Sequence, residues 1–271
     1  MFFDLCVEWP QGVSSSDAPL LIGKATGPVP DLYKTVALLD NMGYGTIVYN
    51  YNHTGKITPS FSSPIIKDIF SPSLPKTQFL SRITFTLDDT SKAQFLPGLT
   101  AKFDIVAVRP TTEKLLLAAC TSLELDLISL DLSQRLPFHL RHRTVGAAVA
   151  RGLKFEICYS SSTRSSSDLN SRRNLIANAA ALFRATRGKG IVISSGALSA
   201  LECRAPYDIS NLATLWGFSM EKGKEAVQDG AKSVVVRARA RRRSWKGVVE
   251  VDLHEQDPQE NVPNAKRRKV G

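Results

Sequence analysis

Short apolar runs separated by amphipathic stretches repeat along most of the chain. Eight runs have the length and the β-branched or aromatic content of strands: FFDLCV (2–7), TIVYN (46–50), SRITFTL (81–87), FDIVAV (103–108), DLISL (126–130), KFEICY (154–159), GIVIS (190–194) and SVVVR (233–237). Between them, apolar residues at helical spacing predict helices, most clearly over 31–42, 112–120 and 167–187. Strands and helices therefore alternate.

Runs that are apolar throughout are typical of parallel strands covered by helices on both faces. Eight strand–helix repeats match the count of a closed (β/α) barrel of the TIM type, so we predict an α/β fold with this architecture. An open, doubly wound sheet is the alternative. The second repeat is weak, because residues 55–78 are rich in Ser and Pro and offer only 65–70 as a helical turn. We expect one domain over 1–250 and a disordered tail over 251–271, where the apolar periodicity ends.

The charge of the chain is strongly positive. It has 271 residues with 35 Lys and Arg against 25 Asp and Glu, a net +10, which indicates a polyanionic partner or a basic tail. Residues 231–247 contain no acid and seven of the cations: Lys232, Arg237, Arg239, Arg241, Arg242, Arg243 and Lys246.

If the strand at 233–237 continues, alternation places Arg237, Arg239 and Arg241 on one face. A buried strand does not accommodate three unpaired guanidinium groups, so we expect this face to meet solvent or an anion. Trp245 favours nucleic acid, because an aromatic ring stacks on a base while arginines hold phosphates. A merely solvated basic edge is the alternative.

Residues suited to catalysis or metal binding are few. The four cysteines, Cys6, Cys120, Cys158 and Cys203, form no CxxC pair, so we expect free thiols. His139 and His142 have helical spacing, but the arginines beside them repel a cation. The chain contains no GxSxG, Walker, GxGxxG or HExxH motif.

Four carboxylates lie in or beside the predicted strands: Asp4, Asp104, Asp126 and Glu156. Three of them lie near strand starts, whereas catalytic residues of barrels lie at the carboxyl ends. We expect them to bind backbone and basic groups at the bottom of the barrel, and we predict no catalytic and no metal-binding residue.

Two terminal segments bear on localisation. The N-terminus MFFDLCVEWPQG has Asp4 and Glu8 where a signal peptide needs positive charge and an unbroken apolar run, so we expect a soluble intracellular protein. Lys266, Arg267, Arg268 and Lys269 match a nuclear import signal, which predicts the nucleus, with an incidental basic tail as the alternative.

Several long segments together resemble one known family. FDIVAVRPTTEKLLLAACTSLELDLISLDL, RLPFHLRHRTVGAAVARGLKFEICYS and RRNLIANAAALFRATRGKGIVISSGALSALECRAPYDISNL are similar to the thirty-kilodalton protein subunits of archaeal and eukaryotic ribonuclease P, shared in eukaryotes with ribonuclease MRP. The resemblance covers roughly residues 1–250, and MFFDLCVEWPQ and SGALSALECR look most like the fungal branch.

This resemblance implies a barrel related to the metal-dependent PHP phosphoesterases but without their metal site. Those enzymes carry His-x-His at the end of the first strand, where this chain reads Asp4, Leu5, Cys6 and Val7. The family supports a catalytic RNA in the 5′ maturation of precursor tRNA and in pre-rRNA processing. Magnesium is then expected on the RNA, and no cofactor on this chain. The implied partners are the ribonuclease P and MRP RNAs, a small ferredoxin-like subunit, the other protein subunits and, in the holoenzyme, precursor tRNA; no membrane is implied.

The resemblance also gives the loop after the seventh strand an interpretation. Ser194, Ser195 and Gly196 follow that strand at the barrel mouth, where we predict a phosphate loop assisted by Arg204. The alternative is a tight crossover with Arg204 tied to Glu202 or Asp208.

Arg172 and Arg173, near the start of the preceding helix, are predicted to point to the same end of the barrel and to bind RNA. The leading hypothesis is a non-catalytic RNA-binding subunit. Its rivals are a PHP-type metal-dependent phosphoesterase and a protein-interaction scaffold without direct RNA contact.

Overall fold

The computed structural model describes residues 1–11, 32–55, 61–164, 168–245 and 249–250. The predicted tail over 251–271, its basic cluster Lys266 to Lys269, and Lys246 lie outside the described residues.

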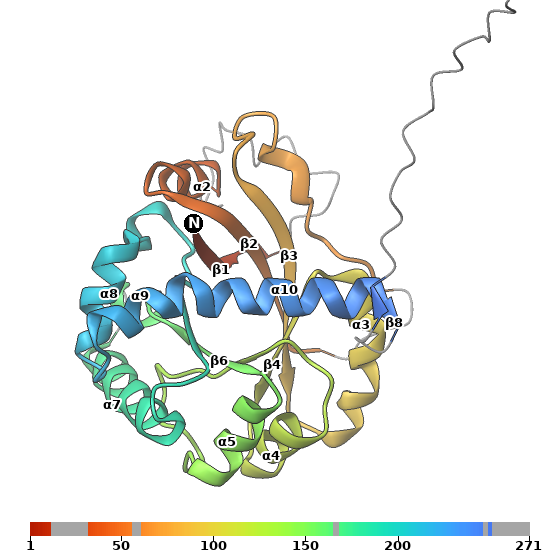
Figure 1. Ribbon diagram of the computed structural model, residues 1–271, viewed down its shortest axis with the longest axis vertical. Helices are drawn as coiled ribbons and strands as arrows, with labels where there is room; N and C mark the ends of the chain where they lie inside the picture. The colour runs from red at the N-terminus through yellow and green to blue at the C-terminus, as the bar shows by residue number, and fades with distance from the viewer. Residues whose placement is uncertain (12–31, 56–60, 165–167, 246–248, 251–271) are drawn as a thin grey trace, which may run out of the picture.

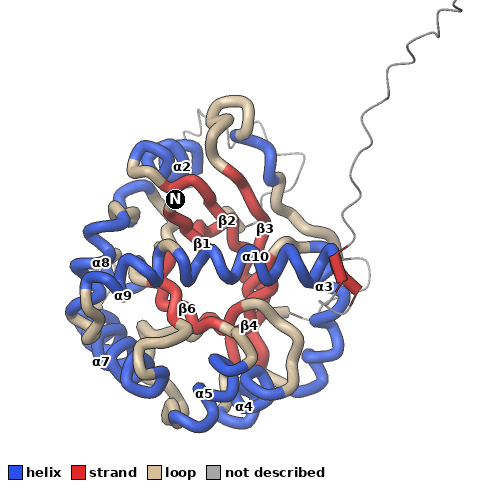
Figure 2. The backbone as a smooth tube through the Cα atoms, viewed as in Figure 1, coloured by secondary structure: helices blue, strands red, loops and turns tan. Residues whose placement is uncertain are grey.

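Seven parallel strands form one sheet in which the order in space is the order in sequence (Figures 1 and 2). The strands are β1 (Phe2–Glu8), β2 (Tyr44–His53), β3 (Gln78–Leu87), β4 (Ile105–Pro110), β5 (Leu127–Ser129), β6 (Lys154–Cys158) and β7 (Ile191–Ser194). They match the first seven predicted runs.

The sheet closes between β1 and β7. Val7 forms a parallel bridge with Ala197, just beyond β7. The amide of Gly196 donates to the carbonyl of Cys6 at 2.7 Å, and the amide of Glu8 donates to the carbonyl of Ala197 at 3.0 Å. The predicted α/β barrel is therefore confirmed, with seven strands, and the open sheet is excluded.

Helices cover the outside of the barrel. They are α2 (Leu32–Asn41), α3 (Leu96–Lys102), α4 (Glu113–Thr121), α5 (His142–Ala150), α6 (Ser160–Thr163), α7 (Leu169–Thr186), α8 (Pro206–Thr214) and α9 (Met220–Val227), with 3₁₀ turns η2 (Lys67–Phe70), η3 (Thr90–Phe95) and η4 (Ala200–Glu202). The outer core lies between these helices and the strands. Among the described residues, no helix has the length and apolar character needed to cross a membrane.

The eighth predicted strand is wrong. Residues 233–237 belong to the helix α10 (Asp229–Arg243), which is followed by a small hairpin of β8 (Ser244–Trp245) and β9 (Val249–Glu250). The run of valines favours a strand locally, but packing overrides such propensities. As a helix, this segment buries Ala231, Val234, Val235 and Ala238 on one face and leaves Val236 exposed.

That apolar face closes the lower end of the barrel. It packs on Phe3, Leu5, Val48, Ile105, Ala107, Leu127 and Val192, which project from five strands and form a second core inside the lumen. In Figure 1, α10 crosses in front of the barrel strands. The helix thus seals the end at which the strands begin.

Two neighbouring valines on α10 test this packing. Val234 is 1% exposed and Val236 is 56% exposed. We expect Val234→Ala to lower the free energy of unfolding by about 2 kcal/mol, because it removes two buried methyl groups and leaves a small cavity. Val236→Ala should change it by no more than about 0.5 kcal/mol. Urea unfolding measures both, and equal effects would contradict the docked position of α10.

Candidate functional site

The residues of β2 and β3 that point into the barrel change from apolar to polar along the strand. In β2 the inward series is Val48, Asn50 and Asn52, and in β3 it is Leu80, Arg82 and Thr84. A period of two places every second residue on the same face of a strand. The half of the lumen next to α10 is therefore apolar, and the half toward the carboxyl ends of the strands is polar.

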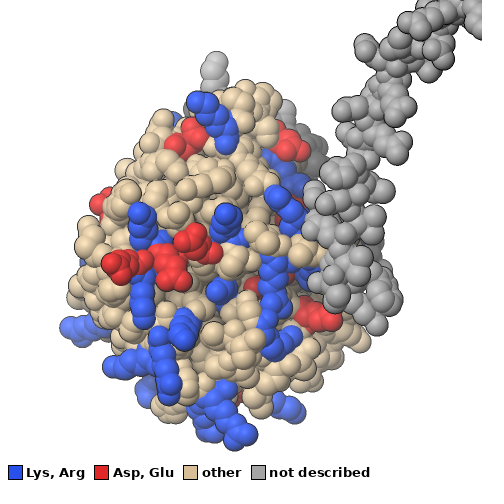
Figure 3. All heavy atoms as spheres, viewed as in Figure 1, with Lys and Arg blue, Asp and Glu red and all other residues tan. Residues whose placement is uncertain are grey.

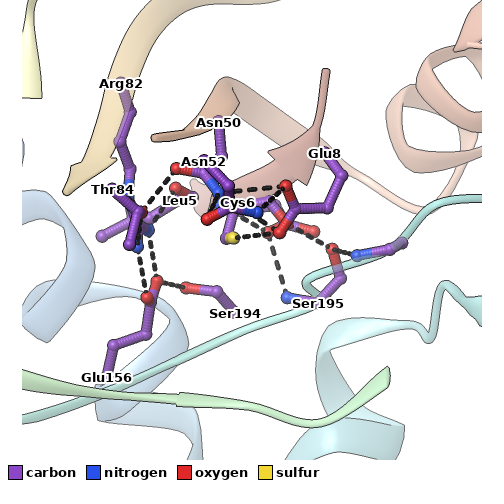
Figure 4. A network of polar contacts seen from close by, with 12 residues as sticks. Leu5, Cys6, Glu8, Asn50, Asn52, Arg82, Thr84, Glu156, Ser194 and Ser195 are labelled. Atoms are coloured by element: carbon purple, nitrogen blue, oxygen red, sulfur yellow. Dashed lines mark hydrogen bonds and ion pairs between the residues drawn. The ribbon is translucent and has the colours of Figure 1, made fainter. Parts of the chain in front are cut away.

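An ion pair spans the polar half of the lumen. Arg82 on β3 and Glu156 on β6 are each 0% exposed and are joined by two hydrogen bonds of 2.5 Å (Figure 4). Arg82 also donates to the carbonyl of Leu5 at 2.8 Å and to Thr84. Ser194 on β7 donates to Glu156 at 2.7 Å.

Both members of this pair are held in their charged forms. Burial alone would raise the pKa of Glu156, but Arg82 and the hydrogen bonds to the carboxylate hold that pKa below its usual value. Burial likewise opposes the charge of Arg82, and Glu156 outweighs it and raises the pKa of the guanidinium. The pair consequently joins four strands across the lumen and carries no net charge.

The predicted phosphate loop is part of the barrel seam. Ser194, Ser195 and Gly196 are buried. The amide of Ser195 donates to Asp4 at 3.1 Å, its hydroxyl donates to the carbonyl of Cys6 at 3.0 Å, and the amide of Gly196 is bound to the same carbonyl. Because these amides of Ser195 and Gly196 already have partners inside the protein, the prediction that they cradle a phosphate is wrong.

A cavity of about 290 Å³ opens at the carboxyl ends of the strands. Its lining includes Glu8, Asn52, Arg109, Cys158 and Arg164. The amides of Asn50 and Asn52 donate to the carboxylate of Glu8, the latter at 2.6 Å. Burial still raises the pKa of Glu8, although Asn52 and Arg82 oppose the shift.

Three of the four histidines lie in the described residues, and each is away from this cavity lining. His53 stacks on Phe85 and packs against Phe61. His142 contacts the carbonyl of Ala185 through Nδ1, and His139 is exposed. Among the described residues, the group of side chains arranged to share a metal ion is instead Cys6, Glu156 and Cys158, whose ligand atoms lie within 4.8 Å of one another.

Three of the arginines of α10 bind other groups of the protein. Arg241 binds Asp126 through two hydrogen bonds, of 3.0 and 2.7 Å, and Arg242 forms an ion pair with Asp104. Arg237 donates to the carbonyl of Arg151. The prediction that Arg237, Arg239 and Arg241 share one face of a strand is therefore wrong. Arg239 is exposed, and Arg243 is the last residue of the helix.

The predicted role of the carboxylates is confirmed for two of the four. Asp104 and Asp126, each just before a strand, bind backbone amides as well as the α10 arginines at the lower end of the barrel. The other two lie farther from the lower end of the barrel: Asp4 is in the seam and Glu156 is in the lumen. The acidic residues thus anchor α10 at one end and organise the interior at the other.

The remaining predicted arginines lie at the opposite end of the barrel. Arg172 and Arg173 are exposed in the first turns of α7, and Arg172 donates to the carbonyl of Ser162. Arg204 donates to the carbonyls of Leu201 and Cys203. The alternative in which Glu202 binds Arg204 is wrong, because Glu202 pairs with Arg164 at 3.0 Å. The structure therefore separates the predicted RNA-binding residues into two groups.

Basic side chains gather around α10 on the surface shown in Figure 3. They extend over α7, α9 and α5, while a smaller acidic group lies over α9 and the start of α10. We call the exposed cations at the end of α7, in the loop before β7 and on α10 the basic face: Arg184, Arg187, Lys189, Lys232, Arg239 and, paired with Asp104, Arg242. The first three do not stand out in the sequence, because they are spread around a helix end rather than clustered in one run.

Comparison with known proteins agrees with this architecture. Residues 1–243 match the family model described as RNase P subunit p30. A probable ribonuclease P protein subunit 3 from Schizosaccharomyces pombe is 39% identical over 250 residues, covering 92% of this chain and 98% of the relative. A ribonuclease P/MRP protein subunit from Saccharomyces cerevisiae is 36% identical, covering 92% of this chain and 84% of the relative.

The fold is also similar to a chain in a cryo-EM structure of archaeal ribonuclease P with mature tRNA. The TM-score is 0.63 at 14% sequence identity, covering 83% of this chain and 96% of that chain. At this identity the likeness shows the shared barrel fold.

The seam carboxylate predicts a pH dependence of stability. Burial raises the pKa of Asp4 from 3.8 to about 6 against the opposing hydrogen bonds from Ser195, and its Oδ2 atom has no partner. Between these pH values the folded state binds more protons than the unfolded state, so this group makes the free energy of unfolding fall as pH rises. The loss levels off near pH 7, about one unit above the pKa in the folded state, and amounts to about 3 kcal/mol.

Asp4→Asn removes this titration and keeps an oxygen that accepts the two amide hydrogen bonds. Relative to the parent, the variant should therefore gain about 3 kcal/mol of stability between pH 4 and pH 7. Urea unfolding at one-unit steps measures this difference. A difference that stays constant with pH would contradict the shifted titration.

Two arginines of α10 distinguish anchoring from exposed charge. Arg241→Ala leaves Asp126, which is 0% exposed, without its cation, and we expect a loss of about 3 kcal/mol in the free energy of unfolding. Arg239→Ala is the matched control and should change this free energy by less than about 0.5 kcal/mol. Thermal and urea unfolding provide the measurement; similar stabilities for the two variants would show that the Asp126 contact does not anchor the helix.

Proposed function

The chain belongs to the RNase P subunit p30 family, and we propose that it acts as a non-catalytic, RNA-binding subunit of the ribonuclease P ribonucleoprotein and of ribonuclease MRP. In this role it supports the RNA that matures the 5′ end of precursor tRNA and takes part in pre-rRNA processing. The observation that carries the proposal is the family match over residues 1–243, which spans the barrel from its first strand to the end of α10.

The chemistry of the lumen supports an accessory role. A metal-dependent phosphoesterase activates water at an open metal position beside its substrate. Here the guanidinium of Arg82 lies in the lumen, bound to Glu156, and the place where the resemblance to PHP enzymes would put His-x-His reads Asp4, Leu5, Cys6 and Val7. We therefore assign bond cleavage to the RNA, with magnesium held there.

The distribution of unpaired charge supports an RNA contact. Phosphate backbones are bound mainly by Lys and Arg, and the energy comes largely from released counterions. The basic face offers Arg184, Arg187 and Arg239, and the opposite end offers Arg173, all exposed. We place Arg172, Arg204, Arg237, Arg241 and Arg242 second, because their guanidinium groups already bind the protein; Arg243 and Lys246 remain candidates.

The proposed partners are the ribonuclease P and MRP RNAs, precursor tRNA in the holoenzyme, a small ferredoxin-like subunit and the other protein subunits of the particle. The names of the fungal relatives support the assembly with ribonuclease P and MRP components. The cluster Lys266 to Lys269 supports import into the nucleus, and we propose the nucleus and nucleolus as the location.

Salt-dependent RNA binding tests the proposal and identifies the contacting end. One variant replaces Arg184, Arg187 and Arg239 with alanine, and a second replaces Arg172 and Arg173. Affinity falls as salt rises, and each lost phosphate contact should make the slope of log affinity against log salt less steep by about 0.7 to 0.9. We expect the triple variant to lose about two units of slope with ribonuclease P RNA.

Matched controls carry lysine at the same positions, which keeps the positive charge, so their slopes should stay close to that of the parent. Circular dichroism confirms that each variant is folded. If neither alanine variant changes the affinity or the salt slope, direct RNA binding by these surfaces is excluded. That result would support the hypothesis of a protein-interaction scaffold without direct RNA contact. Turnover of a phosphodiester substrate by the purified chain without RNA would instead favour the phosphoesterase hypothesis.

A further inference from the structure

The cavity at the mouth of the barrel is lined by an arginine and an aspartate that do not bind each other. Arg109 lies near the end of β4, Asp131 follows the neighbouring strand β5, and both line the cavity of about 290 Å³. No hydrogen bond or ion pair joins the Arg109 side chain to another described residue, and its Nε atom is buried without a partner. We propose that this cavity binds the base of one unpaired guanine nucleotide, held between Arg109 and Asp131.

Asp131 is oriented by its own turn and keeps one oxygen available. Its Oδ1 atom accepts hydrogen bonds from the amide of Ser133 at 3.2 Å and from the hydroxyl of Ser133 at 2.6 Å. Among the described residues, nothing donates to its Oδ2 atom. The second carboxylate of the lining, Glu8, is already engaged, because the amides of Asn50 and Asn52 donate to both of its oxygens. Asp131 is therefore the acceptor that a ligand meets.

The charges of the lining balance, which favours an uncharged ligand. The lining contains two cations and two carboxylates: Arg109, Arg164, Glu8 and Asp131. Arg164 also pairs with Glu202 at 3.0 Å, so its charge is compensated outside the cavity. A bound phosphate needs an excess of positive charge, which this cavity lacks. A neutral ligand with acceptors on one edge and donors on another satisfies an arginine and a carboxylate together.

Guanine is the base that has these two edges. Its O6 and N7 atoms are neighbouring acceptors, and an arginine binds them with two parallel hydrogen bonds. Its ring N1–H and its N2 amine are neighbouring donors that a carboxylate accepts. Adenine and cytosine instead present one amine beside an acceptor nitrogen, and uracil presents a single N–H between two carbonyls. Arg109 and Asp131 together therefore discriminate guanine from the other three bases.

The size and the walls of the cavity suit a single base. Small-molecule pockets span about 300 to 1,000 Å³, so this cavity is at the lower limit and admits one base rather than a helical segment. Leu130 and Leu132 line it and give apolar surface for the flat faces of a ring. Proteins commonly read RNA by taking an unstacked base from a loop or bulge and binding its edges.

A cation for the RNA backbone lies at the same end of the barrel. Arg172 binds the carbonyl of Ser162 in α6, and Ser161 of the same short helix lines the cavity. Arg173, the next residue along α7, is exposed. It is available for a phosphate near the inserted base. The inference rests on the proposed RNA-binding function and adds to it a base that this chain recognises.

Binding of short oligonucleotides by the full chain tests the proposal. Fluorescence polarisation compares a labelled oligouridine with the same strand carrying one central guanine. We expect the guanine to tighten binding about tenfold, since a bidentate contact discriminates bases by about that factor. A central adenine or cytosine should give no such gain. Inosine, which lacks the N2 amine, and 7-deazaguanine, which lacks N7, should each bind more weakly than guanine.

Single variants assign the two edges. Arg109→Gln and Asp131→Asn should each reduce the preference for guanine to less than about threefold and leave the affinity for oligouridine close to that of the parent. Replacing guanine with 7-deazaguanine should no longer matter to the Arg109 variant, and replacing it with inosine should no longer matter to the Asp131 variant. A merely structural role of either residue would not pair each variant with one base analogue.

Two exposed residues provide matched controls. Arg173→Gln should weaken the binding of both strands by the same factor, because it removes a phosphate contact, and should keep the preference for guanine. Glu124→Gln changes a carboxylate just before β5, at the opposite end of the barrel, and should keep both the affinity and the preference.

The guanine site is overturned if the parent binds both strands equally, if another base gives the same gain, or if the Arg109 and Asp131 variants keep the preference. Equal binding of both strands leaves the proposed RNA-binding function intact, whereas binding of neither strand contradicts that function as well. Should a variant fail to fold, as judged by circular dichroism, the inosine and 7-deazaguanine strands on the parent decide the question.

Discussion

The buried pair of Arg82 and Glu156 is the interaction on which the interior of this barrel depends. Two full charges with no exposed surface are stable only when they face each other and when their remaining hydrogen-bonding positions are filled. Thr84 on the strand of Arg82, and Leu5 and Ser194 on two further strands, fill those positions. The pair therefore ties distant strands together in one geometry. It also divides the lumen into an apolar part sealed by α10 and a polar part open to the mouth.

Helix α10 shows that a positively charged segment need not leave its charges free to bind a partner molecule. The segment contains most of the local positive charge, yet three of its arginines bind Asp104, Asp126 and the carbonyl of Arg151. The acidic partners come from the starts of β4 and β5, more than one hundred residues earlier in the chain. A basic run that looks like a nucleic-acid surface in the sequence is thus partly a clamp that holds a helix over the barrel. Of the exposed cations around this clamp, Arg184, Arg187 and Lys189 come from the end of α7 and the loop after it, and Lys232 and Arg239 come from α10 itself.

The sequence was sufficient for seven strands, the main outer helices and the family, because these depend on local periodicity and on long matching segments. It failed at 233–237, where three successive valines suggest a strand and only the inner face of the barrel shows why Val234 and Val235 lie in a helix. It also could not place Cys6 beside Cys158, or Arg82 beside Glu156. Those contacts cross the lumen, and they depend on the stagger of the strands rather than on any spacing along the chain. The alternative pairing of Arg204 with Glu202 failed for a similar reason, because Glu202 pairs with Arg164.

The seam between β1 and β7 joins residues that are far apart in the chain, as the contact of Asp4 with Ser195 across 191 positions shows. During synthesis on the ribosome, one edge of the first strand stays unpaired until almost the whole barrel has been synthesised. The apolar lumen stays exposed for longer, because α10, which covers it, follows the last strand of the barrel. Such long-range closure is slow and leaves apolar surface exposed before it is complete. A nascent chain of this protein is therefore a natural client for chaperones until its final helix emerges.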